Sequence, residues 1–154
     1  MIADKSCAEI RRRLAYAPEK VFAAFAKAEL ITRWLTPSPE IKLTVLKLDF
    51  REGGSYRFAY HVPEAPTVIV AGSYSIITPP SRIVFSWVIE PPDEHAGIES
   101  EVSVAITPDG TGSELVIRHE RLRRTDAIER HAAGWRGAVD QLTQLLAQEE
   151  HHDR

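Results

Sequence analysis

The sequence contains a single cysteine, Cys7, among its 154 residues. One cysteine excludes an intrachain disulfide and any metal cluster built on several thiolates. Histidine supplies no clear substitute, because no two histidines stand four residues apart as ligands on one helical face would. The tail group of His151, His152 and Asp153 would at most bind adventitious metal. We therefore predict neither a metal ion nor another cofactor.

Long apolar runs and an excess of either charge are also missing. No stretch of 18 apolar residues occurs, and the first residues lack the apolar centre of a signal peptide. The net charge is −3, whereas a nucleic-acid-binding protein normally carries a strong basic excess. We expect a cytoplasmic protein with no nucleic-acid partner and no integral membrane contact. Its length predicts one domain over residues 1–154, with a core over about 8–148.

Motifs for covalent catalysis and phosphate binding are absent as well. No serine lies in a Gly-x-Ser-x-Gly string, and Cys7 precedes the first expected strand. Gly110-Thr111-Gly112 lacks the lysine and the following helix of a phosphate-binding loop, and is typical of a hairpin turn. The sequence therefore indicates no catalytic residue, and we expect a binding protein rather than an enzyme.

Apolar residues recur in two different periods along the chain. Residues 8–16 alternate as in a half-buried strand, and Pro18 then opens a short helix followed by a second helical turn that carries Trp34. From Leu43 onward the period is two. The short connections between these runs require antiparallel neighbours. The expected strands cover about 43–50, 56–60, 68–76, 83–89, 102–106 and 115–119.

A long amphipathic helix closes the chain. Asp126 and Glu129 form a candidate capping pair, and the apolar stripe continues to about residue 149. Gly134 and Gly137 flank a tryptophan within it, although each interior glycine costs a helix roughly 1 kcal/mol. One long helix across a curved sheet, with small residues beside a large aromatic, predicts an α+β fold built around a cavity.

Several strings together resemble one known group of proteins, over about residues 8–148. They are Ala17-Pro18-Glu19-Lys20-Val21-Phe22, Trp34, Asp49-Phe50-Arg51-Glu52-Gly53-Gly54, Gly72-Ser73-Tyr74, the run from Pro79 to Trp87, the run from Gly110 to Leu115, His119, and Gly134-Trp135. These strings resemble the SRPBCC superfamily, which has the START-like or birch-pollen-allergen-like helix-grip fold. Within it the chain is most similar to bacterial homologues of the C-terminal domain of the heat-shock-protein-90 ATPase activator.

The resemblance implies a helix-grip fold. In that fold a curved antiparallel sheet of six or seven strands wraps a long C-terminal helix, and two short helices follow the first strand. Family members typically bind hydrophobic small molecules or have no assigned activity. The separate N-terminal domain that the eukaryotic co-chaperone uses with its partner is not found in this sequence, which weakens the expectation of a chaperone partner.

Aromatic and histidine side chains at inward positions are the candidate ligand-binding residues. Ligand pockets are mostly apolar and aromatic, with a few fixed polar groups. Filling of the core is the alternative explanation for each aromatic, and an inward histidine is more often structural than functional. A pair formed by His119 and His131 could orient a ligand or act as acid and base. The candidates are Trp34, Tyr56, Phe58, Tyr60, Phe85, Trp87, His119, His131 and Trp135.

We accordingly expect an apolar small-molecule ligand, hydrophobic or amphipathic, between the sheet and the last helix. Gly134 and Ala138 either leave space for it or let the helix approach the sheet closely. The opening would lie among the short helices near Trp34, the Pro63–Pro66 hairpin and the Pro91–Gly97 loop. Two alternatives remain: a chaperone-regulating or stress-response interaction module, and a cyclase-type or hydrolase-type enzyme acting on an apolar substrate. A homodimer is compatible with the pattern but is not required by it.

Overall fold

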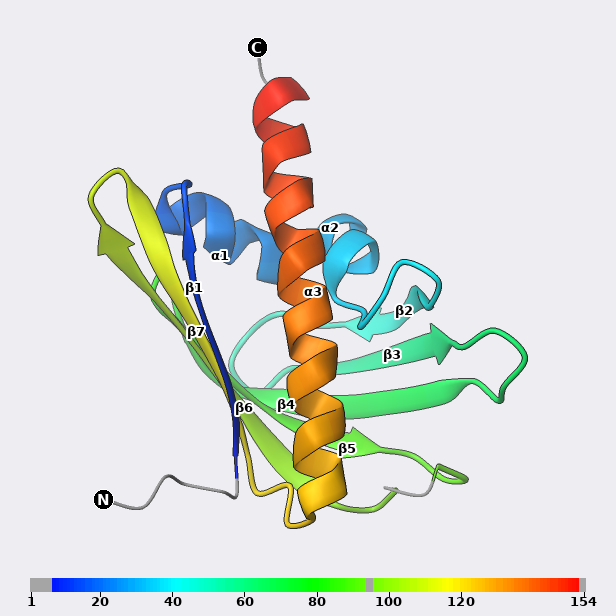
Figure 1. The fold of residues 1–154 in the computed structure, drawn as a ribbon. Helices are drawn as coiled ribbons and strands as arrows, with labels where there is room; N and C mark the ends of the chain where they lie inside the picture. The colour runs from blue at the N-terminus through cyan, green and yellow to red at the C-terminus, as the bar shows by residue number, and fades with distance from the viewer. Residues whose placement is uncertain (1–6, 94–95, 153–154) are drawn as a thin grey trace.

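The computed structural model describes residues 7–93 and 96–152, and shows a curved seven-stranded antiparallel sheet crossed by one long helix (Figure 1). The strand order is β1-β7-β6-β5-β4-β3-β2. This arrangement confirms the predicted helix-grip fold, including the two short helices after the first strand. In chain order the elements are β1 (Ala8–Leu14), α1 (Pro18–Ala26), α2 (Ala28–Trp34), β2 (Lys42–Leu48), β3 (Ser55–His61), β4 (Val68–Thr78), β5 (Arg82–Ile89), β6 (Glu99–Asp109), β7 (Gly112–Glu120) and α3 (Thr125–His152).

Short turns join β2 through β7 as consecutive antiparallel neighbours, and β1 returns to pair with β7 at the far edge. The β6–β7 hairpin closes through Gly110 and Thr111. Gly110 has a φ of +60°, which a two-residue hairpin turn commonly requires and glycine adopts without strain. The predicted hairpin at this position is therefore present.

Helix α3 buries its apolar stripe against the concave face of the sheet (Figure 1). It begins at Thr125, so Asp126 lies within its first turn rather than at its cap. The buried stripe of α3 consists of Trp135, Ala138, Val139, Leu142, Leu145 and Leu146. Sheet residues in the same core include Val102, Val104, Ile106, Leu115 and Ile117.

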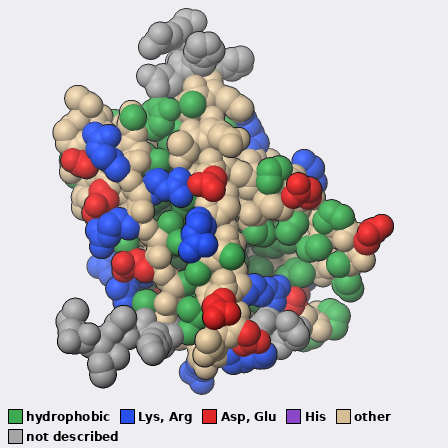
Figure 2. Space-filling view, in the orientation of Figure 1, with side chains coloured by type: hydrophobic (Ala, Val, Ile, Leu, Met, Phe, Trp, Pro, Cys, Tyr) green, Lys and Arg blue, Asp and Glu red, His purple; other side chains and the backbone are tan. Residues whose placement is uncertain are grey.

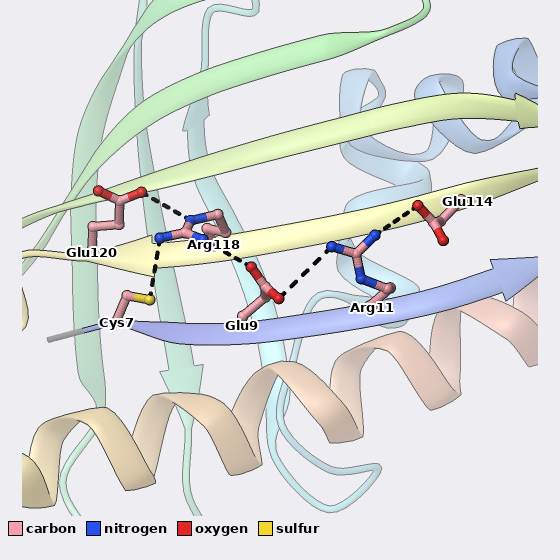
Figure 3. Close-up of polar contacts among 6 residues, drawn as sticks. All are labelled: Cys7, Glu9, Arg11, Glu114, Arg118 and Glu120. Carbon is pink, nitrogen blue, oxygen red and sulfur yellow. Dashed lines mark hydrogen bonds and ion pairs between the residues drawn. The ribbon is translucent and has the colours of Figure 1, made fainter. Parts of the chain in front are cut away.

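The opposite face of β1 and β7 is charged and solvated (Figure 3). Arg118 binds Glu9 at 2.9 Å and Glu120 at 3.1 Å, and Arg11 binds Glu114 at 2.8 Å. Exposed ion pairs of this kind contribute about 0–1 kcal/mol each, so they add little to stability. The arginines on the outer face of β1 are therefore paired with carboxylates. The apolar core lies on the opposite side of the sheet, which α3 covers.

The two glycines of α3 have different surroundings. A Cβ on Gly137 would lie 2.0 Å from the backbone oxygen of Pro37, in the loop between α2 and β2. A Cβ on Gly134 would meet only the Pro37 Cβ, at an ordinary 3.6 Å. The side-chain amide of Gln141 also donates to the carbonyl of Thr36 at 2.6 Å. The close approach to the sheet, one of the two expectations for Gly134 and Ala138, is therefore not found at Gly134. A close approach occurs instead at Gly137, and it is made to this loop.

This difference predicts opposite effects for two alanine substitutions one helical turn apart. Gly137→Ala should lower the free energy of unfolding by about 1–3 kcal/mol, because the new methyl group collides with a backbone oxygen. Gly134→Ala should be neutral or should stabilise by up to about 1 kcal/mol, because the methyl fits and alanine favours a helix. Urea unfolding of both variants tests this, and equal stability of the two would contradict the assigned contact.

Candidate ligand pocket

A cavity of about 590 Å³ opens between α3, the α2–β2 loop and the adjoining ends of β3, β4 and β5. In Figure 2, hydrophobic side chains gather beside α3 around a hollow on its β3–β4 side. The volume falls within the range typical of small-molecule sites. The lining residues are Leu35, Thr36, Pro37, Ser38, Ile41, Tyr60, Val62, Val68, Val70, Trp87, Ile89, Arg130, His131, Ala133, Gly134, Trp135 and Ala138.

The α2–β2 loop forms one wall of this cavity, and hydrogen bonds hold its backbone in place. The Tyr60 hydroxyl donates to the carbonyl of Leu35 at 3.0 Å. The Thr36 hydroxyl donates to the carbonyl of Ile41 at 2.6 Å. Burial raises the pKa of Tyr60 far above its usual value, so this hydroxyl stays a neutral donor. The hydroxyl protons of Tyr60 and Thr36 are therefore used in hydrogen bonds to backbone carbonyls of this wall.

An ion pair connects the β5–β6 loop to the first turns of α3. The guanidinium of Arg130, which lines the cavity, makes two hydrogen bonds to the carboxylate of Asp93, at 2.9 and 3.0 Å. Two parallel N–H···O bonds give such a pair a defined geometry as well as a balanced charge. The positive charge of Arg130 is thus compensated by the protein itself, which favours a ligand without a net charge.

A chain of hydrogen bonds runs behind the aromatic wall, through His119. The Trp135 indole N–H donates to His119 Nδ1 at 3.0 Å, so that nitrogen carries no proton. The His119 proton is therefore assigned to Nε2, which lies 2.7 Å from Ser100 Oγ and donates to it. The Ser100 hydroxyl in turn donates to the backbone carbonyl of Trp87 at 2.9 Å. Each group in the chain has a partner for the proton it holds.

The electrostatics of His119 agree with this pattern. Burial lowers the pKa of His119 well below its usual value, and the neighbouring His131, whose ring centroid is 4.6 Å away, lowers it further. His119 is therefore neutral at physiological pH, with both ring nitrogens in hydrogen bonds. It positions the indole of Trp135, and this geometry does not suit it to act as acid or base on a ligand.

Four of the nine residues predicted from the sequence line the cavity. Tyr60, Trp87, His131 and Trp135 come from β3, β5 and α3, and the ring centroids of Trp87 and Trp135 are 5.5 Å apart. His131 is anchored through Nδ1, which donates to the carbonyl of Ala127 at 2.8 Å. The structure thus brings these four together at one cavity, and their contact with a ligand remains a prediction.

The other five lie in the core, outside the lining. Trp34 is fully buried and donates its indole N–H to the carbonyl of Ala24 at 2.9 Å. Tyr56 packs on Phe58 with ring centroids 4.6 Å apart, and on Phe85 at 5.7 Å. The Tyr56 hydroxyl donates to a backbone carbonyl at 2.7 Å. His119 supports the wall from behind, as described above.

Sequence reasoning missed the loop and the polar edge of the cavity. The α2–β2 loop contributes Leu35 through Ser38 and Ile41, and no hydrophobic period identifies such a segment. Arg130 could have been found, because it lies on the same helical face as Gly134 and Ala138, at spacings of four and eight residues. Of the three segments expected to surround the opening, the one near Trp34 lines the cavity through Leu35. Val62, directly before Pro63, is also a lining residue, and the β5–β6 loop contacts the lining only through the bond of Asp93 to Arg130.

The described part of the chain has neither a group of metal-ligating side chains nor a membrane-spanning helix. Among the side chains of residues 7–93 and 96–149, no three of histidine, cysteine, aspartate or glutamate are placed to hold a metal ion. Within the same ranges, no helix is both long and apolar enough to cross a membrane. The tail group that starts at His151 lies outside the described side chains.

Comparisons with known proteins identify relatives by sequence and by fold. A family model described as "Activator of Hsp90 ATPase homolog 1-like protein" matches residues 15–147. No curated protein matches the chain. Among solved structures, CV1439 from Chromobacterium violaceum is 23% identical with a TM-score of 0.83, covering 93% of this chain and 98% of that one. The AHSA1 protein SPO3351 from Silicibacter pomeroyi is 25% identical with a TM-score of 0.82, covering 93% and 99%.

The neutral state of His119 predicts a dependence of stability on pH. The unfolded chain takes up the His119 proton below about pH 6.5, while the folded protein resists it, so stability is complete above that pH and is lost as the pH falls toward the folded pKa. The contribution is up to about 1.4 kcal/mol per pH unit. His119→Gln should therefore flatten the decline in unfolding free energy between pH 6.5 and 5, measured by urea unfolding.

A matched control for this measurement is His61→Gln, which alters an exposed histidine on β3 that contacts the Thr44 hydroxyl. This variant should keep the wild-type slope. If His119→Gln also kept the wild-type slope, the assignment of a buried neutral His119 would be wrong.

Proposed function

This chain belongs to the family of activator of Hsp90 ATPase homolog 1-like proteins, and from that premise and the cavity we propose that it binds a hydrophobic or amphipathic small molecule between its sheet and α3. The observation that carries the proposal is the cavity of about 590 Å³ with its largely apolar lining. Apolar walls of this extent attract apolar surface, since each 100 Å² removed from water gains about 2.5 kcal/mol before ordering costs.

The polar groups of the cavity support a neutral ligand. Tyr60 and Thr36 donate to backbone carbonyls, and Asp93 binds Arg130. A charged ligand would have to compete with these bonds or lose its hydration without compensation. A compact apolar molecule with a small polar group fits this lining better than an anion or a cation does.

Neither alternative from the sequence has a specific observation in its favour. An enzyme using His119 would need that ring at the cavity surface, whereas it lies behind Trp135 with both nitrogens bonded. A protein-interaction module would present an exposed apolar patch, and Leu46 is the one large hydrophobic residue exposed in the described part of the chain. A chaperone partner and a homodimer therefore stay as alternatives that this proposal does not use.

Two broader expectations also remain proposals. We propose that residues 1–154 act as a single domain, which is supported by a family match that begins at residue 15, directly after β1, and ends at residue 147 within α3. We propose a cytoplasmic location on the sequence features given above.

Native mass spectrometry of freshly purified protein tests the proposed function. The expected result is a stoichiometric adduct, whose released small molecule is identified after solvent extraction. Gly134→Leu should reduce the adduct about tenfold or more, because the larger side chain occupies the cavity, and a tenfold loss needs only about 1.4 kcal/mol.

The matched control is Arg136→Leu, which places the same side chain on an exposed position of the same helical turn. This variant should retain the adduct. Equal occupancy in both variants would show that the adduct lies elsewhere. Absence of an adduct, together with no uptake of an added apolar probe such as fluorene, would contradict the proposal.

A further inference from the structure

One buried polar group at the cavity has no partner among the described residues. The indole N–H of Trp87 on β5 finds no hydrogen-bond acceptor there, although the side chain is only 7% exposed. The other two tryptophans differ, because Trp34 donates to the carbonyl of Ala24 and Trp135 donates to His119. The missing acceptor is therefore a property of this position and not of the indoles of this fold in general.

A buried donor without an acceptor destabilises a folded protein, because the group loses its hydrogen bond to water and gains none in return. Native structures satisfy nearly all such groups, so each exception needs a physical explanation. An acceptor that the protein chain itself does not supply is one such explanation.

None of the side chains whose rings pack on Trp87 accepts a hydrogen bond from its indole N–H. His119 and Trp135, with ring centroids 5.5 Å from that of Trp87, are bonded to each other, and the second nitrogen of His119 donates to Ser100. His131, at 6.2 Å, donates through Nδ1 to the carbonyl of Ala127, and Phe85, at 6.5 Å, has no polar atom to offer. In this structure the ring cluster therefore does not supply an acceptor for the indole.

Trp87 borders two empty spaces. One is the cavity of about 590 Å³, and the other is a small void of about 10 Å³ that Trp87 shares with Ser100, Leu122 and His131, among others. The small void has room for about one water molecule, which would accept a hydrogen bond. The larger space has room for a ligand that brings its own acceptor, and Trp87 lines it beside Trp135.

We propose that Trp87 is a specificity-determining residue, whose indole N–H donates to an acceptor oxygen on the bound ligand. This inference rests on the proposed function and narrows its ligand class to neutral, apolar carbonyl compounds such as ketones. A ketone oxygen fits because it accepts a hydrogen bond and adds no donor that would itself need a partner. A pure hydrocarbon of the same shape leaves the indole unsatisfied.

A matched pair of probes isolates this hydrogen bond. Fluorene and 9-fluorenone share one fused tricyclic frame and differ by a CH₂ group against a C=O group. Equilibrium dialysis gives the Kd of each probe, and the ratio of the fluorene Kd to the fluorenone Kd measures the preference for the oxygen. In Trp87→Phe this ratio should fall about tenfold relative to the wild type, because the donor is removed for both probes but matters to only one.

Trp135→Phe is the matched control. It also replaces an indole of the same cavity by a phenyl ring, but the indole N–H that it removes already donates to His119. Both probes should weaken together, so the ratio should stay within about twofold of the wild type. An equal fall of the ratio in both variants would overturn the assignment to Trp87.

A measurement on the unsubstituted protein covers the case in which Trp87→Phe does not fold. In a ¹⁵N–¹H correlation spectrum, the Trp87 indole proton, assigned through its contacts to neighbouring protons, should move downfield with fluorenone but not with fluorene. If both probes bind and shift this proton equally, the donor inference fails while the proposed function stands. If neither probe binds and native mass spectrometry shows no adduct, the proposed function fails as well.

Discussion

The cavity depends on one close contact, between Gly137 of α3 and the backbone oxygen of Pro37. Because glycine has no side chain there, the α2–β2 loop lies directly against the helix, where Gln141 also binds its backbone. The loop thereby becomes a wall on one side of α3 while the sheet forms the other. Gly134, one turn earlier, leaves open the space between them. A larger residue at position 137 would move the loop and change the shape of the cavity.

The aromatic wall depends in a similar way on complete hydrogen bonding behind it. A histidine surrounded by apolar groups is tolerated when each of its nitrogens has a partner, and a partly satisfied network would be worse than an apolar core. The bonds from Trp135 through His119 to Ser100 meet that condition and join α3, β7 and β6. They fix one indole of the wall, whereas the N–H of the other, Trp87, has no acceptor among the described residues.

The sequence predicted the fold well because the periods of two and 3.6 residues follow directly from strand and helix geometry. It could not separate cavity lining from core, because Trp34 and Trp87 both occupy inward positions and only the three-dimensional path of α3 decides which one meets an open space. Likewise, Gly134 and Gly137 look alike in the sequence. Their difference arises from the α2–β2 loop, whose path no local pattern specifies.

The cavity combines largely apolar walls with the indole N–H of Trp87, which has no acceptor among the described residues. The proposed ligand would contact both, would bind the folded chain and would have no comparable site on the unfolded one. Its free energy of binding therefore adds directly to folding stability, by RT ln(1 + [L]/Kd). Under the proposed function, the same two features that select the ligand also make the stability of the protein depend on what the cavity contains.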